Sequence, residues 1–368
     1  MSKEEKSVFE AVVHVGESHV FYRGGIGAVL AVYEQYFPVF KAIGTHRHIS
    51  GIGKIVYFGK NYLRFIWTMI TDPKIRVIHI HGSYGVSVIR KALIAFTGKS
   101  IFRKKLIYQI HSSEYPQKYD LAPAYQKKMI DFLFRKADLV GCLTKKWQEL
   151  YKEKFGLSNT VVIPNMIHPP DFEAASRIIP GQDQPIQLAF LGLIHEKKGI
   201  FEMVQMVADN KREFTGKLII HIGGIGKVDE LNDMITGNGL EQIVKFRGWI
   251  GESDKAALYK EVDAFILPSH NEGLPVVILE AMSYGLPIIA TRVGGIPEIM
   301  EHELNGFLFE KGDIVAMQIA ISAYIVNHEL MQTHGRNSLE LVKNYFPDQV
   351  VPQIAAVYNR LLDKNPGA

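Results

Sequence analysis

Two glutamates eight residues apart, Glu272 and Glu280, are the residues whose type and spacing best fit a chemical role. Ionised carboxylates accept hydrogen bonds, so such a pair can hold the hydroxyl groups of a sugar. Glu272 taken alone could also be a helix N-cap, a role worth about 1 kcal/mol. Glu280 stands among valine, isoleucine, leucine, alanine and methionine, where a carboxylate must find partners or change its pKa. Glu280 is therefore the harder of the two to explain as a purely structural residue.

The segment around these glutamates, 266–298, predicts a strand, a short polar loop and then a helix. We expect the strand to end near Leu267 and the helix to begin between residues 273 and 275, because a proline in the first turn loses no hydrogen bond. N–H groups at a helix start lack helical acceptors and can bind an anion such as a diphosphate. The amides expected to do this belong to Leu274, Val276 and Val277.

Several short motifs resemble known ligand sites but are incomplete. GKS at 98–100 lacks the first glycine of the phosphate-binding loop, and GGIG at 24–27 and 223–226 does not complete G-x-G-x-x-G. His79 and His81 alternate on one predicted strand, but no HExxH motif or nearby third ligand accompanies them. We therefore expect no metal site. The lack of an Asp-x-Asp pair also removes the simplest way to hold a divalent ion beside a diphosphate.

The elements that must position these residues follow a regular pattern. Short β-rich runs alternate with helix-length amphipathic segments, which predicts parallel βαβ units in an α/β fold of two doubly wound, Rossmann-like domains. A length of 368 residues also favours two domains. The expected strands are 8–15, 75–81, 106–111, 138–143, 160–164, 186–192, 217–222, 243–247, 263–267 and 287–291. The expected helices are 25–36, 54–70, 85–97, 123–136, 144–155, 198–209, 227–236, 253–261, 274–285 and 313–330.

A linker is expected at 164–185, which carries five prolines and little hydrophobic period. This places the N-terminal domain at 1–170 and the C-terminal domain at 171–349. Open parallel sheets bind ligands beyond the carboxyl ends of their strands. Two such domains would therefore hold a ligand in a cleft between them.

Composition and charge narrow the class of protein. With 47% hydrophobic and 22% charged residues the chain is neither disordered nor fibrous, and no apolar run reaches the roughly 18 residues of a membrane span. The single cysteine, Cys142, excludes an internal disulfide, and with the N-terminal sequence it favours a cytoplasmic protein. Residues 1–180 hold 26 Lys and Arg against 14 Asp and Glu, whereas 181–368 hold 16 against 24. The basic half could meet an anionic ligand, a membrane or nucleic acid, or could only complement the acidic half.

The segment NEGLPVVILE resembles the Glu-x7-Glu motif of glycosyltransferase family 4, whose members have the GT-B fold of two facing Rossmann-like domains. Four further elements resemble family motifs in order along the chain: HVGESHVFYRGGIGAVL, VVIPNMI, FLGLIHEKKG and ATRVGGIPEIMEHELNGFL. The resemblance covers most of the chain. It implies that 345–363 forms a helix that crosses back to the N-terminal domain, to which we assign 350–368.

The resemblance assigns roles to single residues. Glu280 would hold the ribose hydroxyls of a donor nucleotide, Glu272 would contact the donor sugar, and Lys198 would neutralise the diphosphate. Gly24 and Gly25 would let an N-terminal loop approach the phosphates, because glycine has no Cβ. Backbone contacts to the donor sugar and diphosphate would come from Gly273, Leu274, Pro275, Val276 and Val277.

His111 ends a predicted strand and matches the family histidine that contacts the donor sugar near the reacting carbon. Each of these residues also has a structural explanation. Lys198 alone could be a solvated lysine at a helix start, His111 a satisfied histidine at a strand end, and the glycine cluster a plain turn. Their occurrence together favours the functional interpretation.

One position departs from the family pattern. Leu193 stands where the family has the arginine of its GRL element, which is half of the usual cationic clamp on the diphosphate. Arg292 or Arg247 could replace it, or donor binding could be weaker.

Two basic segments with interleaved aromatic residues, 54–70 and 98–105, could contact a membrane surface. Several members of the family that the chain resembles build glycans on lipid carriers, and such contact would suit a lipid-linked or glycan acceptor. The alternative is a helix that packs Phe65 and Trp67 into its domain while its lysines stay in water.

We therefore expect a cytoplasmic, metal-independent, retaining glycosyltransferase at the inner membrane face, with UDP, GDP or another nucleoside diphosphate sugar as donor and no cofactor. Its product would belong to surface polysaccharide or lipid-linked glycan synthesis. The alternatives are a GT-B phosphorylase or epimerase, and a catalytically silent GT-B subunit that supports a partner enzyme. We do not expect nucleic-acid binding.

Overall fold

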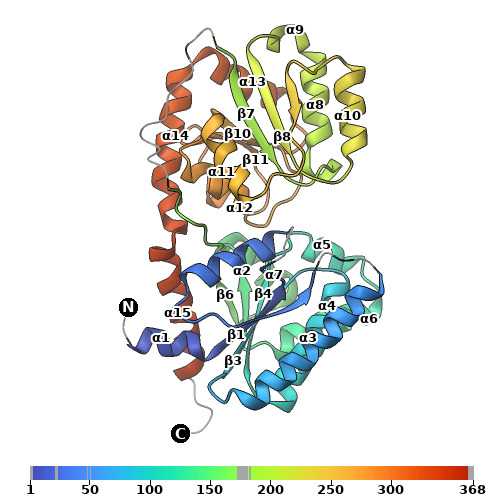
Figure 1. Ribbon diagram of the computed structural model, residues 1–368, viewed down its shortest axis with the longest axis vertical. Coiled ribbons are helices and arrows are strands. Elements are labelled where there is room, and N and C mark those ends of the chain that lie inside the picture. The colour runs from blue at the N-terminus through green and yellow to red at the C-terminus, as the bar shows by residue number, and fades with distance from the viewer. Residues whose placement is uncertain are drawn as a thin grey trace. The chain divides into compact units, whose positions relative to one another are not determined.

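The computed structural model describes residues 3–20, 24–47, 49, 51–171, 181 and 184–363. Two compact units form the chain (Figure 1). The N-terminal unit comprises Met1–Ile167 and Tyr345–Ala368, and the C-terminal unit comprises His168–Asn344. These boundaries lie within a few residues of those predicted from the linker and the returning C-terminal helix.

The N-terminal unit has a six-stranded parallel sheet in the order β2-β1-β3-β4-β5-β6. Its strands are β1 (Val12–Glu17), β2 (Ala42–His46), β3 (Val77–Gly82), β4 (Lys105–Ile110), β5 (Leu139–Cys142) and β6 (Thr160–Val162). Its helices are α1 (Lys3–Glu10), α2 (Gly25–Tyr36), α3 (Ile52–Thr71), α4 (Val86–Phe96), α5 (Tyr115–Asp120), α6 (Ala124–Lys136), α7 (Lys145–Phe155) and α15 (Pro347–Asp363), with a π-helical turn η1 (Thr97–Ile101).

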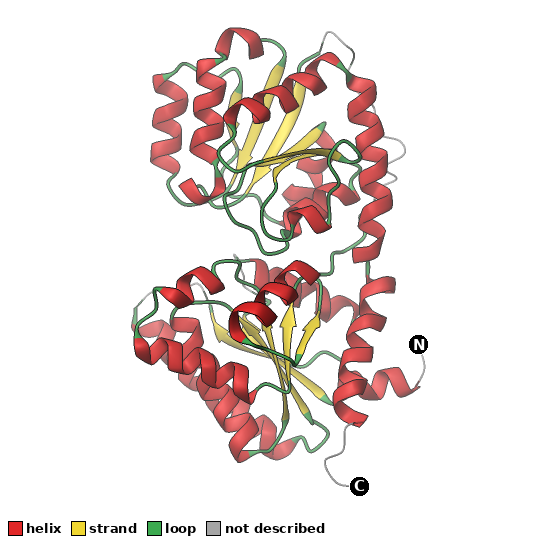
Figure 2. Cartoon of the chain, turned by 180° about the vertical axis from the view of Figure 1, so that it is seen from behind, coloured by secondary structure: helices red, strands yellow, loops and turns green. Residues whose placement is uncertain are grey.

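The C-terminal unit repeats this architecture with the strand order β12-β11-β10-β7-β8-β9 (Figure 2). Its strands are β7 (Ile186–Leu191), β8 (Leu218–Gly223), β9 (Val244–Phe246), β10 (Ala264–Leu267), β11 (Ile288–Thr291) and β12 (Gly306–Phe309). Its helices are α8 (Ile200–Asp209), α9 (Lys211–Phe214), α10 (Val228–Gly237), α11 (Glu252–Glu261), α12 (Val276–Ser283), α13 (Ile314–Val326) and α14 (His328–Val342). Short 3-10 turns lie at η3 (Glu196–Lys198), η4 (Ile296–Glu298) and η5 (Lys343–Tyr345).

The central strands are buried along their whole length, as every residue of β3, β10 and β11 shows. Parallel strands covered by helices on both faces have this pattern, because neither face meets water. The predicted α/β class with two doubly wound domains is confirmed.

Two element boundaries were predicted wrongly. The range 8–15 is not one strand: α1 ends at Glu10 and β1 begins at Val12. Phe9 belongs to the helix because its ring packs 5.7 Å from that of Tyr358 on α15, a contact that lies far away in the sequence. The range 313–330 is two helices, because the Asn327 side chain accepts a hydrogen bond from Leu330 N and caps the start of α14.

The sequence analysis also missed several elements, namely β2, β12, α5, α9 and α14. Strands β2 and β12 lie at the sheet edges. Only alternate residues of β2 are buried, so its apolar signal is weak, whereas β12 is apolar but only 4 residues long. Helix α15 does pack on the N-terminal unit, as the resemblance implied. The Arg76 guanidinium donates to Leu362 O at 2.8 Å, and Tyr358 is fully buried.

Candidate active site

Lys198 and Glu272, 74 residues apart in the sequence, form an ion pair in the C-terminal unit. Nζ of Lys198 lies 2.5 Å from Oε1 of Glu272, and the same oxygen accepts a 2.7 Å hydrogen bond from the Ser269 hydroxyl. The Thr291 hydroxyl donates in turn to Ser269 O at 2.5 Å. The Glu272 side chain is only 11% exposed, so its carboxylate is held rather than freely solvated. The structure therefore joins two residues predicted separately and adds Ser269, which the sequence analysis did not single out.

Two glycines let the loop that carries Glu272 pack closely against its neighbours. Gly294 has φ +52°, and a Cβ there would lie 1.6 Å from the carbonyl oxygen of Glu272. Gly199 has φ +65°, and a Cβ there would lie 2.0 Å from the carbonyl oxygen of Pro268. Glycine is the residue that adopts this left-handed conformation without strain. Both glycines thus fix the backbone on either side of the Lys198–Glu272 pair.

Helix α12 begins at Val276, slightly later than predicted, with Pro275 as its N-cap. Glu272 therefore lies in the loop ahead of the helix, and Glu280 lies in its second turn rather than two turns beyond Glu272 on one helix. The amides of Val276 and Val277 are the first of the helix and have no acceptor one turn earlier. An anion near this end meets those amides and the positive end of the helix dipole.

The two residues before Pro275 make contacts inside the C-terminal unit. The carbonyl oxygen of Gly273 accepts a hydrogen bond from Gly295 N at 2.9 Å. The Leu274 side chain is 4% exposed and packs into the unit. Any contact of Leu274 with a ligand would therefore come from its backbone, as expected from the sequence.

Glu280 makes two strong contacts that the sequence analysis did not predict. Its Oε1 lies 2.7 Å from Lys255 Nζ, and its Oε2 accepts a 3.0 Å hydrogen bond from the Tyr259 hydroxyl. Lys255 also contacts Glu252 at 2.8 Å. Burial raises the pKa of Glu280 more than Lys255 lowers it, so that the net shift is upward. The expectation that this carboxylate must find partners in its apolar surroundings is confirmed, and α11 supplies them.

In the N-terminal unit, Gly24 and Gly25 lie at the start of α2, beyond the carboxyl end of β1. A Cβ on Gly24 would lie 2.9 Å from Oε2 of Glu17, whereas one on Gly25 would meet nothing within 4 Å. The Glu17 carboxylate is the far end of a flexible side chain and can move aside, so close packing does not by itself require glycine at either position. The residues just before this pair lie outside the described part of the chain.

His111 follows β4 directly, at the same carboxyl edge of the sheet. Its backbone N–H donates to Gly82 O at 3.0 Å, and its Nε2 lies 3.0 Å from Nδ1 of His81. Burial, with a smaller effect of the Lys91 charge, lowers the pKa of His111 to about 3. The imidazole is therefore neutral at physiological pH.

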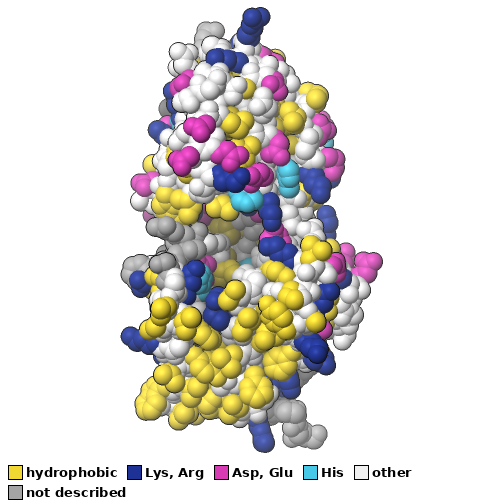
Figure 3. Space-filling model, turned by 90° about the vertical axis from the view of Figure 1, so that its right-hand side faces the viewer, with side chains coloured by type: hydrophobic (Ala, Val, Ile, Leu, Met, Phe, Trp, Pro, Cys, Tyr) yellow, Lys and Arg dark blue, Asp and Glu magenta, His cyan; other side chains and the backbone are white. Residues whose placement is uncertain are grey.

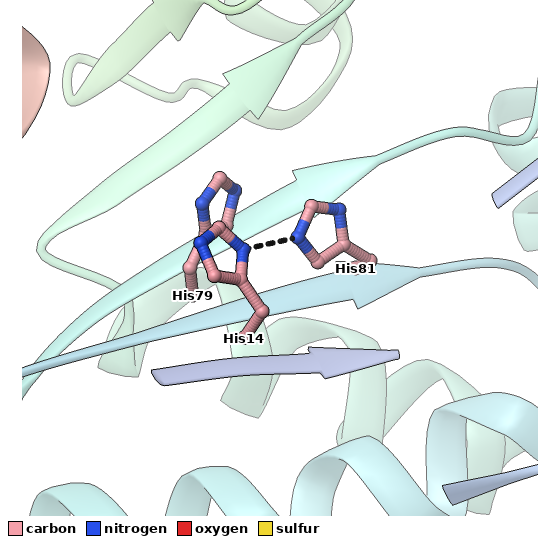
Figure 4. Close-up of side chains that lie close together, drawn as sticks. All are labelled: His14, His79 and His81. Atoms are coloured by element: carbon pink, nitrogen blue, oxygen red, sulfur yellow. Dashed lines mark hydrogen bonds between the residues drawn. The ribbon is translucent and has the colours of Figure 1, made fainter. Parts of the chain in front are cut away.

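The prediction that His79 and His81 lack a nearby third ligand was wrong. His14 on β1 pairs in register with His79 on β3. The three side chains lie together, with one ring nitrogen from each within 4.8 Å of the others (Figure 4). All three rings are buried, and burial lowers the pKa of each.

Lys91 is a further residue that the sequence analysis missed. This lysine of α4 is 2% exposed, and its Nζ contacts the Thr45 hydroxyl at 2.7 Å and Val15 O at 3.3 Å. Burial lowers its pKa to about 7, and the charge of Arg90 acts in the same direction. A buried lysine in an amphipathic helix gives no local signal, because its burial depends on β1 and β2.

Comparison with known families agrees with this geometry. The model described as "Glycosyl transferases group 1" matches residues 171–340, and the model described as "Glycosyltransferase Family 4" matches residues 17–169. The chain belongs to the family 4 glycosyltransferases. The two matches together span both units, so the resemblance found in the sequence is confirmed.

Individual proteins show the same likeness to this glycosyltransferase. An uncharacterized glycosyltransferase of Methanocaldococcus jannaschii is 25% identical over 318 residues, which are 83% of this chain and 74% of that protein. The capsular polysaccharide biosynthesis glycosyltransferase CapM of Staphylococcus aureus is 28% identical over 186 residues. That alignment covers 49% of this chain and 47% of CapM, so it spans about half of either protein.

Among solved structures, Anabaena HepE in complex with UDP superposes with a TM-score of 0.69 at 19% sequence identity. The superposition covers 95% of this chain and 99% of HepE. This likeness establishes the GT-B fold for the family 4 glycosyltransferase described here.

Leu193, which stands in place of the family arginine, has no replacement among the two arginines considered above for this glycosyltransferase, because both are paired elsewhere. The Leu193 side chain is 47% exposed just after β7. Arg247 forms two contacts with the Glu261 carboxylate at 2.7 and 2.6 Å, and Arg292 lies 3.4 Å from Glu310. Both arginines considered as replacements are thus paired with glutamates. Lys198 is the cation that the structure places in contact with Glu272.

Proposed function

We propose that this glycosyltransferase moves a sugar from a nucleoside diphosphate sugar to a hydroxyl group of a glycan or lipid-linked acceptor, with retention of configuration. The observation that carries the proposal is the Lys198–Glu272 pair, held at the carboxyl end of β10 beside the start of α12. The UDP bound to HepE supports a nucleotide donor. The likeness to CapM, a glycosyltransferase of capsular polysaccharide biosynthesis, supports surface polysaccharide synthesis as the setting.

In this proposal Lys198 and the amides of Val276 and Val277 stabilise the diphosphate. The bond between the anomeric carbon and the phosphate oxygen breaks, and the acceptor oxygen forms a new bond to that carbon on the same face. The acceptor proton passes to the departing phosphate oxygen. A fixed cation and helix amides stabilise the charge that grows on the leaving group, so the proposal uses no metal ion and no cofactor. Glu272 contacts the transferred sugar.

Glu280 binds the ribose hydroxyls in the same proposal. Its two carboxylate oxygens are held by Lys255 and Tyr259, and each oxygen keeps a lone pair for a hydroxyl donor. Because α11 fixes the carboxylate before the ligand arrives, little ordering is left to be done on binding.

A thermal-shift panel of UDP, GDP, ADP and their common sugars, without added metal, tests the proposal. A ligand at 100 times its dissociation constant stabilises the folded protein by about 2.7 kcal/mol. We expect one base to raise the unfolding midpoint of the wild type. Glu280→Gln should abolish the shift, and Glu340→Gln, at a surface glutamate of α14 that contacts Lys343, should keep it. A folded wild type that responds to no nucleotide would overturn the proposal.

We also propose that the N-terminal unit contacts the inner, cytoplasmic leaflet of the membrane through an apolar face on α3 and α4. Figure 3 shows hydrophobic side chains gathered over this unit. The apolar face consists of residues that are 39 to 77% exposed, namely Ile52, Ile55, Val56, Leu63, Trp67 and Ile70 of α3, Val86, Ile89, Leu93 and Phe96 of α4, and Ile101 of η1. Monomeric proteins rarely expose a large continuous apolar area, and where one is found it usually marks an interaction site.

The charges around the apolar face favour an anionic membrane as its partner. Lys54, Lys60 and Arg64 of α3 are exposed between its apolar residues. The lysines of 98–105 are less available, because Lys99 contacts Asp138 at 2.5 Å and Lys104 donates to Ile75 O at 2.6 Å. Each of the two alternatives for α3 fits one of its aromatic residues. Phe65 is buried in its domain, whereas Trp67 is 67% exposed and available for a membrane contact. Amphipathic basic helices of this type lie in the plane of anionic membranes.

Among the described residues, no single helix is both long enough and apolar enough to span a bilayer. One bent pair, Ile314–Val326 with His328–Asp363, has the length and composition of a span when the two are taken together, with a bend of 106° between them.

A further inference from the structure

Arg90 on α4 carries a positive charge that the described part of the chain does not pair. Its side chain is half-buried, and its Nε is buried without a hydrogen-bond partner among the described residues. The next residue, Lys91, contacts the Thr45 hydroxyl and Val15 O, which are neutral oxygens and not carboxylates. A buried polar group without a partner is costly, and burial accordingly lowers the pKa of Arg90. An anion that reached Arg90 would relieve this cost.

The position of Arg90 on α4 places it inside the apolar face. Residues three and four apart share one side of a helix. Arg90 comes four positions after Val86 and three before Leu93, and these two side chains are 68% and 39% exposed. Ile89, directly before it, is 42% exposed. The group that meets Arg90 here must therefore be an anion with apolar parts beside it.

The sequence that builds the apolar face offers almost no acid to neutralise Arg90. Residues 35–113 contain 13 Lys and Arg but only one acidic residue, Asp72. That carboxylate contacts Lys41 at 2.7 Å and is therefore already paired. The anion that complements Arg90 thus has to come from a partner.

The spread of cations favours a membrane leaflet over a single soluble ligand. Lys54, Lys60 and Arg64 are exposed on α3 between apolar residues of the same face. Figure 3 shows hydrophobic and basic side chains together over this unit. One small anion cannot reach positions distributed over two helices, whereas a leaflet presents many phosphates above an apolar layer. Apolar side chains with dispersed cations are therefore complementary to anionic phospholipid.

We propose that Arg90 is a phospholipid-binding residue, whose guanidinium binds the headgroup phosphate of an anionic phospholipid while the lipid chains contact the apolar face. The inference rests on the membrane contact proposed above and adds one defined headgroup site to it. A guanidinium binds two phosphate oxygens at once through its fixed fork of N–H groups. A lysine ammonium has the same charge but lacks that fork. Substitution can therefore separate a defined site from attraction by charge alone.

Titration with vesicles of phosphatidylcholine and phosphatidylglycerol tests the site. Arg90→Lys keeps the charge and should weaken vesicle binding at least fivefold, and Arg90→Gln should weaken it at least tenfold. Arg360, an exposed arginine of α15 in the same unit, provides the matched controls. Arg360→Lys should bind within twofold of the wild type, and Arg360→Gln should weaken binding less than threefold. Arg90→Gln should not lower the urea midpoint of unfolding, because Arg90 has no partner to lose within the described residues.

Monomeric dihexanoyl phosphatidylglycerol, followed by phosphorus-31 NMR, separates this site from the membrane contact. We expect the wild type to broaden the phosphorus signal, and Arg90→Lys to lose most of that broadening. Broadening that depends on Arg90, without vesicle binding by the wild type, would refute the membrane contact and support the site. If no nucleotide binds while the lipid results hold, the proposed sugar transfer fails and the site stands.

Several results would overturn the proposal. Equal lipid binding by Arg90→Lys and the wild type would show that only charge matters, and no binding of either form of the lipid would remove the ligand altogether. A lower urea midpoint for Arg90→Gln would show that the guanidinium serves the fold. Self-association of the wild type that Trp67→Glu abolishes would make a second copy of the chain, and not a lipid, the occupant of the apolar face.

Discussion

Nζ of Lys198 lies 2.5 Å from Oε1 of Glu272, so the cation assigned to the diphosphate is held by the carboxylate assigned to the sugar. A donor that reaches this pair meets a lysine whose position is already fixed. The pair is partly exposed, with the Lys198 side chain at 26%. The pair therefore adds little to the free energy of unfolding, and its effect should appear in ligand binding.

Lys198→Met should weaken nucleoside diphosphate binding at least tenfold, because a charge-assisted contact contributes about 1.5 to 3 kcal/mol. Titration calorimetry with the nucleotide found in the thermal-shift panel measures this. Lys197→Met, in the same 3-10 turn but exposed, is the control and should bind within twofold of the wild type. Equal affinities for the two variants would remove Lys198 from the donor site.

Gly294→Ala should destabilise the C-terminal unit and impair nucleotide binding together, because the new Cβ would collide with the Glu272 carbonyl at 1.6 Å. Gly248→Ala is a matched control, since Gly248 also has positive φ, +72°, but open space around its Cβ position. The control should lose only about 1 to 2 kcal/mol from the left-handed conformation. Urea unfolding should show a larger loss for Gly294→Ala. A loss no greater than that of the control would show that the loop moves aside freely.

The free energy of unfolding should fall as pH is lowered from 7 towards 4. His14 and His111 have folded pKa values of about 3, below the ordinary value of 6.5, so between these values the unfolded chain binds protons that the folded protein does not. Stability is therefore present above pH 6.5 and is lost as pH falls towards 3. By linkage, each such histidine lowers the free energy of unfolding at pH 5 by about 2 kcal/mol from its value above pH 6.5.

Urea unfolding at pH 7.5, 6 and 5 measures this dependence. The pKa of Lys91 is lowered to about 7, so Lys91 also lowers the free energy of unfolding as pH falls below about 10. This contribution is complete near pH 7. His14→Phe should reduce the fall in the free energy of unfolding between pH 7.5 and 5. His302→Gln, at a histidine with a 44% exposed side chain, should leave that fall unchanged. An identical slope in His14→Phe would show that His14 titrates normally in the folded protein.

The wild-type protein should float with vesicles that contain anionic phospholipid at low salt, and high salt should release it because screening shortens the reach of charges. Trp67→Glu should reduce the floated fraction at least fivefold. Val326→Glu, at an 80% exposed valine of α13 in the C-terminal unit, adds the same charge elsewhere and should float like the wild type. Failure of the wild type to float would refute membrane contact through the apolar face.

Local sequence information predicted most of the βαβ pattern but not the partners within the site. The Glu280 environment shows why: six apolar neighbours, four before it and two after it, indicate that its carboxylate needs partners, yet Lys255 and Tyr259 lie on a different helix. Nothing in the segment Glu252–Glu261 distinguishes these two from other polar residues of an exposed helix. Their role depends on how α11 packs against α12.

The histidine cluster could have been found by a topological argument. In doubly wound sheets of the order 2-1-3-4-5 the first strand lies beside the third, as β1 does beside β3 here. That neighbourhood places His14 opposite His79 in register. The third histidine thus lies on the adjacent strand and not near His79 and His81 in the sequence.

The return of α15 to the N-terminal unit has a consequence for synthesis on the ribosome. The bond between His79 and Tyr358 joins residues 279 positions apart, so the N-terminal unit lacks part of its interior until nearly the whole chain described here has been made. The C-terminal unit, His168–Asn344, is one uninterrupted stretch. Domains generally fold as units while the chain emerges. In this chain the half that is made second is thus the first that can finish folding, and the half that is made first must wait for α15.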